Sequence, residues 1–91
     1  MKLSVTRINE PGREFRCYRY QIYVDGKPFG IFAHNYRGEA ESFTLHGGYN
    51  EDPPFGMSAS FLTGGGPKPL GLTAEAKLYL KKLVQTHGLP S

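Results

Sequence analysis

The chain has 91 residues, of which 38% are hydrophobic and 21% are charged, and its net charge is +3. This composition excludes a disordered chain and predicts one compact domain over residues 1–91, with little room for a deep pocket. The one cysteine, Cys17, excludes an intramolecular disulfide and favours a reducing compartment. Without an apolar run long enough for a signal peptide or a membrane span, we expect a cytoplasmic protein with no membrane partner.

Three short runs predict half-buried strands, because apolar and polar residues alternate in each. They contain Leu3 and Val5, then Phe43 and Leu45, then Met57, Ala59 and Phe61. The segment 47–56 joins the last two runs. It is too long for a tight hairpin, and long loops often carry function.

The strongest local signal is Asp25-Gly26, which lies between two alternating runs. Asp-Gly favours a two-residue type I′ turn, because both central residues need positive φ. Pairing outwards from this turn predicts one sheet face on which Val24 lies opposite Lys27, Ile22 opposite Phe29, Tyr20 opposite Ile31 and Tyr18 opposite Ala33. The other face pairs Tyr23 with Pro28, Gln21 with Gly30, Arg19 with Phe32 and Cys17 with His34.

The C-terminal region predicts one amphipathic helix. Thr73 is a suitable N-cap and Gly88 is placed to end the helix. One apolar stripe follows helical spacing and consists of Ala76, Tyr79, Leu80, Leu83 and Val84. The fold class is therefore α+β: an antiparallel β-meander of about five strands with one C-terminal helix packed on one face, that of Tyr20, Ile22 and Ile31.

The candidates for chemistry are weak. In the predicted register Cys17 and His34 form a thiol–imidazole pair, which could serve a small enzyme, but a cysteine in mid-strand has nothing to lower its pKa. The other histidines, His46 and His87, are not at metal-ligand spacing from this pair, so we expect no metal and no cofactor. The glycine-rich run 64–66 precedes two prolines, which supply no N–H groups for phosphate, and favours a flexible crossover. The acidic residues Glu39, Glu41, Glu51 and Asp52 are interpreted as solvated loop or strand-end charges.

The segment 13–23 interleaves arginine with aromatic residues. Protein interfaces and nucleic-acid-binding sheets both use this combination, and a soluble sheet with a tyrosine core would also show it. One helix can cover only one sheet face, so the predicted register leaves Tyr23 and Phe32 on an uncovered apolar patch with a polar rim. The candidate partner-binding residues are therefore Arg19, Gln21, Tyr23, Phe32 and His34, with Tyr49, Asn50 and Phe55 from the long loop.

A three-stranded sheet with a C-terminal helix is similar in architecture, though not in any motif, to the plant-type DNA-reading domains that lay a sheet in the major groove. The small size without a catalytic constellation also resembles small inhibitor, immunity or phage anti-defence proteins. The leading hypothesis is a non-enzymatic module that docks on another protein, as a monomer or a small homo-oligomer. The first alternative is a nucleic-acid binder that uses Arg13, Arg16, Arg19 and the helix lysines, and the second is the Cys–His enzyme.

Overall fold

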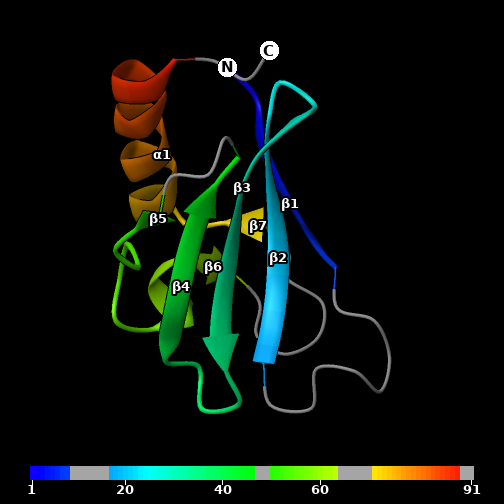
Figure 1. The fold of residues 1–91 in the computed structure, drawn as a ribbon, viewed down its shortest axis with the longest axis vertical. Helices are drawn as coiled ribbons and strands as arrows, with labels where there is room; N and C mark the ends of the chain where they lie inside the picture. Colours follow the sequence, from blue (N-terminus) through cyan, green and yellow to red (C-terminus); the bar gives the residue numbers. More distant parts are fainter. Residues whose placement is uncertain (9–16, 47–49, 64–70, 89–91) are drawn as a thin grey trace.

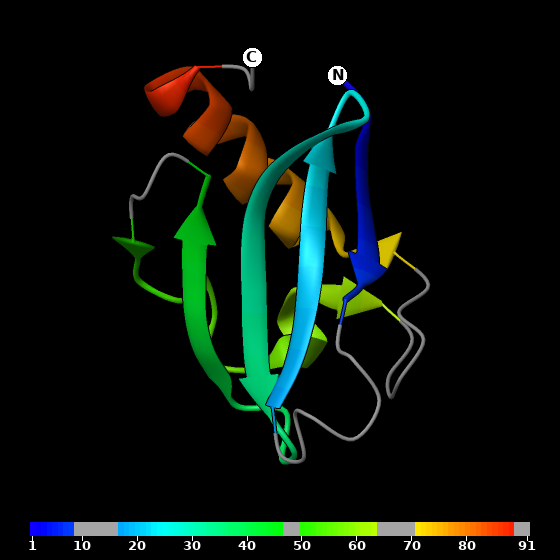
Figure 2. The same ribbon diagram turned by 45° about the vertical axis from the view of Figure 1, so that its right-hand side comes forward.

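The computed structural model describes residues 1–8, 17–46, 50–63 and 71–88. They form two layers: a five-stranded antiparallel sheet, and a second layer with the helix, a 3-10 turn and a two-stranded sheet (Figures 1 and 2). The large sheet has the strand order β1-β2-β3-β4-β5 and consists of β1 (Leu3–Arg7), β2 (Cys17–Val24), β3 (Lys27–Asn35), β4 (Ala40–Leu45) and β5 (Asn50–Glu51). The second layer contains η1 (Ser58–Ser60), β6 (Leu62–Thr63), β7 (Gly71–Leu72) and α1 (Ala74–His87). The predicted α+β meander with a C-terminal helix is confirmed.

The Asp25-Gly26 turn is also confirmed. Asp25 and Gly26 both have positive φ, at 52° and 81°, and Val24 pairs directly with Lys27. The side chain of Asp25 accepts a hydrogen bond from the backbone N–H of Lys2, so the turn also holds the start of β1.

The predicted hairpin register holds only next to this turn. Tyr23 pairs with Pro28 as expected, but the register then shifts and Ile22 pairs with Gly30 instead of Phe29. Phe29 is therefore the extra residue of a β-bulge. Pro28 has no N–H for the ladder, which makes the neighbouring position suitable for a bulge. From Gly30 to the end of β3, every residue lies on the face opposite to the predicted one, because side chains alternate with period two.

The bulge decides which aromatic side chains form the core. Phe32 pairs with Tyr20, is 0% exposed and stacks on Phe61 with 4.4 Å between ring centroids. Ile31, which we expected beneath the helix, pairs with Gln21 on the opposite face and is only half-buried. The remaining buried side chains come from both layers and include Ile22, Val24, Phe29, Phe43, Leu45, Leu62 and Leu72.

The prediction of a strand over Met57, Ala59 and Phe61 is wrong. Ser58–Ser60 forms η1, with the N–H of Phe61 bonded to the carbonyl of Ser58, and the fifth strand of the sheet is Asn50–Glu51 instead. Small serine and alanine side chains contribute little packing on a pleated sheet, and the turn places Phe61 in the core while Met57 is exposed.

Helix α1 has the predicted ends and the predicted buried face. Thr73 accepts a hydrogen bond from the N–H of Ala76, and Gly88 ends the helix at φ 86°. The buried helix residues are Ala76, Leu80, Leu83 and Val84, and Tyr79 packs against the same core. His87 in the last turn lies 3.0 Å from Glu51 of β5, which links the helix to the sheet. Neither α1 nor any other helix in the described ranges has the length and apolar character needed to span a membrane.

Candidate functional site

Three of the predicted partner-binding residues, all in β2, lie on the sheet face away from α1. Figure 2 shows α1 on the other side of the sheet. Arg19 is exposed and Tyr23 is half-buried on this face. Gln21 is buried: its amide nitrogen donates to the carbonyls of Ile22 and Gly30, and its amide oxygen lies 3.2 Å from Nε2 of His46. Gln21 thus holds the bulge in place and is engaged within the chain.

The prediction that Phe32 and His34 lie on that uncovered face is wrong. Both residues follow the bulge, so their side chains face the core, where Phe32 is fully buried and His34 is 9% exposed. Neither side chain can serve as an exposed contact of a patch around Arg19 and Tyr23. The same shift removes the predicted pair of Cys17 and His34, because Cys17 pairs with Asn35.

The predicted loop contribution is only partly described. Tyr49 lies outside the described residues, and so does the side chain of Asn50, whose backbone pairs with Thr44 in β5. Phe55 is half-buried, with its ring 6.1 Å from that of Phe61 and 6.0 Å from that of Tyr79. Phe55 therefore closes the edge of the core.

Buried polar groups form a chain of hydrogen bonds between β2 and the C-terminal end of β3. Nδ1 of His34 lies 2.7 Å from the carbonyl oxygen of Asn35, and Nε2 lies 2.9 Å from the hydroxyl of Tyr20. A carbonyl can only accept, so we assign a hydrogen to Nδ1, and we assign Nε2 as the acceptor of the Tyr20 hydroxyl. Burial raises the pKa of Tyr20, with a smaller opposing effect of Arg7. Because both imidazole nitrogens are engaged, this histidine is poorly placed to act as a general base.

The turn between β3 and β4 is built around the side chain of Asn35. Its Oδ1 accepts from the N–H groups of Arg37 and Glu39, and its Nδ2 donates to the carboxylate of Glu39. The Nε of Arg37 donates to the hydroxyl of Tyr36 across 2.9 Å, and the guanidinium carbon lies 5.4 Å from the centroid of that ring. The turn thus holds Tyr36 and Arg37 in a defined arrangement at the tip of the hairpin.

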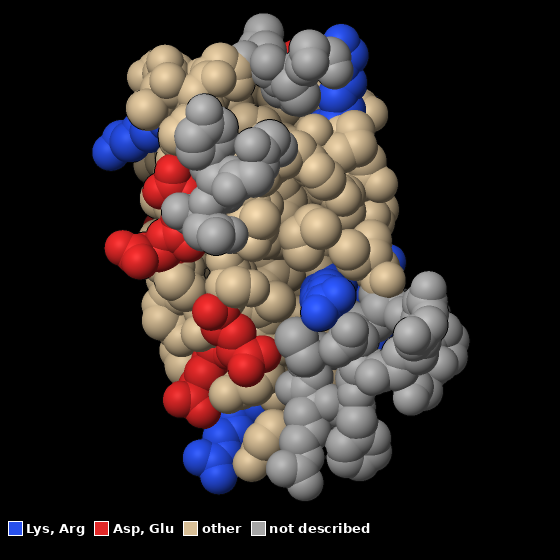
Figure 3. All heavy atoms as spheres, in the orientation of Figure 1, with Lys and Arg blue, Asp and Glu red and all other residues tan. Residues whose placement is uncertain are grey.

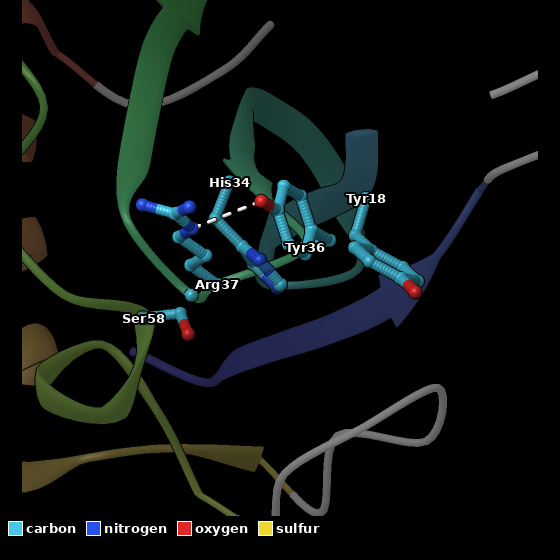
Figure 4. A pocket seen from close by; sticks show the side chains of 6 residues that line it. Tyr18, His34, Tyr36, Arg37 and Ser58 are labelled. Carbon is cyan, nitrogen blue, oxygen red and sulfur yellow. Dashed lines mark hydrogen bonds between the residues drawn. The ribbon is translucent and has the colours of Figure 1, made fainter. Parts of the chain in front are cut away.

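A pocket of about 250 Å³ lies beneath this turn (Figure 4). Its lining residues are Tyr18, His34, Tyr36, Arg37, Gly38 and Ser58. Arg37 and Ser58 lie on one side, Tyr18 lies on the other, and His34 lies between them. The rings of Tyr18 and His34 stack with 5.2 Å between centroids, and the carbonyl of Gly38 accepts from the N–H of Ser58.

Two exposed apolar side chains flank the same turn. Tyr36 is 57% exposed and Met57 is 46% exposed, and a Cβ placed on Gly38 would lie 3.8 Å from Cε of Met57. Met57 also forms an isolated β-bridge with Glu39. We call Tyr36, Arg37 and Met57 the hairpin-tip surface. Sequence reasoning missed it, although Asn35-Tyr36-Arg37-Gly38 between two strand patterns is a turn signal with an aromatic residue and an arginine at its tip.

The charges do not form one surface for nucleic acid among the described residues. Arg13 and Arg16 lie outside the described ranges, and Arg19 is on the sheet face opposite the layer that contains α1. The lysines of α1, Lys77, Lys81 and Lys82, are exposed on that other layer. Figure 3 shows acidic side chains gathered over β4 and β5, the region of Glu39, Glu41, Glu51 and Asp52. Within the described ranges, no three His, Cys, Asp or Glu side chains are grouped to hold a metal ion.

Comparisons with models of protein families, with curated proteins and with solved structures give no match to this chain.

Proposed function

We propose that the protein is a non-enzymatic binding module that docks on another protein through the hairpin-tip surface. The observation that carries this proposal is the exposure of Tyr36 and Met57 on either side of one turn, next to Arg37. Tyrosine, methionine and arginine are enriched at protein interfaces, and tyrosine and arginine dominate their hot spots. Blocking or adapting the partner is the role that this small size favours.

Preorganisation supports the same conclusion. The hydrogen bonds from Asn35 fix the turn, and the contact between Arg37 and Tyr36 fixes both side chains before a partner arrives. Side chains that are already ordered lose less conformational entropy on binding, so more of their contact energy appears as affinity.

The sheet face away from α1 is a second contact region for the same partner. Arg19 and Tyr23 lie there with small or polar neighbours that include Ala33, Ser42 and Thr44. Gln21 and the buried aromatic residues of β3 are excluded from this role, because their side chains are engaged inside the chain.

The test compares the wild-type chain with the double variant Tyr36→Ala/Met57→Ala and with Leu78→Ala. Leu78 is a matched control, since it is 62% exposed on α1 and distant in the chain from the turn. Affinity capture from lysate of the source cells, with and without nuclease treatment, followed by mass spectrometry, identifies the partner. Titration of the purified partner then measures Kd, and circular dichroism verifies that each variant folds.

We expect the double variant to lose about 2 kcal/mol or more of binding free energy, roughly thirtyfold in Kd, while Leu78→Ala binds like the wild type. Equal Kd values for all three chains would refute the proposal. If Tyr23→Ala loses binding and the double variant does not, the interface lies on the sheet face away from α1 instead. Binding that nuclease abolishes, and that falls steeply with salt, would support the nucleic-acid alternative instead.

A further inference from the structure

We infer that the pocket beneath the hairpin tip receives a carboxylate group. Arg37 provides the cation: its Nε is engaged by Tyr36, and its two terminal NH2 groups have no hydrogen-bond partner among the described residues. A guanidinium held in this way presents a rigid pair of donors, which matches the two oxygens of a carboxylate. Ser58 lines the pocket on the same side as Arg37, and its hydroxyl adds a polar group to the lining (Figure 4).

The size of the pocket limits the group that can enter. At about 250 Å³ it has the volume of roughly eight liquid waters, which suits one amino-acid side chain or a small acid. The aromatic wall of Tyr18 and His34 packs against the carbon atoms of such a group, while the arginine and the serine bind its oxygens.

The local charges favour a monoanion over a phosphate dianion. Glu39 lies in the same turn as Arg37, and the side chain of Asn35 is bonded to both residues. Glu39 partly cancels the attraction of the single guanidinium, which grows only in proportion to the charge of the ligand. The cost of removing an anion from water grows with the square of its charge. A singly charged carboxylate is therefore the better fit.

The carboxylate has three sources: an acidic side chain of the partner, the C-terminus of the partner, or a free small acid. The first two rest on the proposed function, whereas the third does not. Three probes separate these sources. N-acetyl-glutamic acid α-amide carries only the side-chain carboxylate, N-acetyl-alanine carries only the terminal carboxylate, and butyrate represents the free acid. N-acetyl-glutamine amide is the uncharged control.

The experiment is a titration of the isotope-labelled full chain, followed through its amide NMR signals. We expect saturable shifts at Tyr36, Arg37, Gly38 and Ser58 with at least one acid, with Kd of about 1–50 mM, and none with N-acetyl-glutamine amide. Arg37→Gln should weaken binding at least about tenfold, and Arg37→Lys should not restore it, because an ammonium group lacks the paired donors. Lys81→Gln, which removes an exposed cation of α1, should leave Kd unchanged.

Met57→Ala separates this inference from the proposed function. Met57 belongs to the docking surface but not to the pocket lining, so this variant should bind the acids normally while it binds the partner more weakly. Shifts that persist in Arg37→Gln, or equal shifts with the uncharged amide, would overturn the carboxylate site and leave the docking proposal intact. If the chain binds the acids but the Tyr36→Ala/Met57→Ala variant binds the partner with the wild-type Kd, the docking proposal is refuted. The pocket is then assigned to a free acid.

Discussion

Tyr20 and His34 join β2 to β3 through a hydrogen bond of 2.9 Å from the phenol hydroxyl to Nε2. The imidazole is also a wall of the pocket, where it stacks on Tyr18. The bond therefore couples the hydrophobic core to the pocket at the hairpin tip. The shape of the candidate site depends on a buried polar pair as well as on the turn.

Tyr20→Phe should destabilise the fold by about 1–3 kcal/mol at pH 7, because it leaves the buried Nε2 of His34 without its donor. Tyr23→Phe is the matched control on the uncovered sheet face, and its effect should stay within about 0.5 kcal/mol. Urea unfolding followed by circular dichroism measures both. Equal stabilities of the two variants would show that the hydrogen bond contributes nothing.

The cost of Tyr20→Phe should also depend on pH. Burial raises the pKa of Tyr20 above its usual value near 10.0. Such a phenol stabilises the folded chain fully below pH 10, and this contribution disappears as the pH rises through the higher folded value. The wild type should therefore lose stability above pH 10, and its advantage over Tyr20→Phe should narrow there. A constant difference in unfolding free energy between pH 8 and about 11 would contradict the raised pKa.

Phe32→Ala and Ile31→Ala together test the bulge. Phe32 is fully buried against Phe61, so its truncation should cost roughly 3–5 kcal/mol, while half-buried Ile31 on the other face should cost on the order of 1 kcal/mol. A hairpin without the bulge reverses this order, since Ile31 then faces the helix. Chemical unfolding of the two variants decides between the registers.

Leu80→Ala and Leu78→Ala test the docking of α1. Leu80 is 0% exposed, and its truncation should cost about 2–5 kcal/mol. Leu78 lies on the exposed side of the same helix, and its truncation should change stability by no more than about 0.5 kcal/mol. Thermal and urea unfolding provide the comparison. An equally small loss of unfolding free energy in both variants would show that the helix does not pack on the sheet.

Gly30→Ala tests the close contact of β3 with β4. A Cβ at this position would lie 3.0 Å from the carbonyl oxygen of Thr44 and 3.1 Å from Cε1 of Phe43. We expect a loss of about 1–3 kcal/mol, because the crowded core must shift. Gly56→Ala is the control, since nothing lies within 4 Å of its added carbon, and it should be neutral or slightly stabilising. A neutral Gly30→Ala would mean that the two strands separate easily.

Two features of the fold, the Asp25-Gly26 turn and helix α1, depend only on residues that are close together in the sequence. The Asp25-Gly26 turn needs positive φ at two adjacent positions, and the helix from Thr73 to Gly88 depends on its caps and its apolar stripe. Both were predicted correctly, because these signals do not depend on contacts with distant segments.

Only the tertiary structure decided which face of β3 enters the core. The alternating pattern of β3 accommodates either face, since Phe29, Ile31 and Phe32 are all apolar. Contacts from distant segments select the bulged register, with Phe61 stacked on Phe32 and Phe43 pressed against Gly30. The hairpin-tip surface follows from the same cause, because Met57 reaches Gly38 only when the turn at Ser58–Ser60 sends Phe61 inward. Such contacts join residues more than 12 positions apart, so no local pattern encodes them.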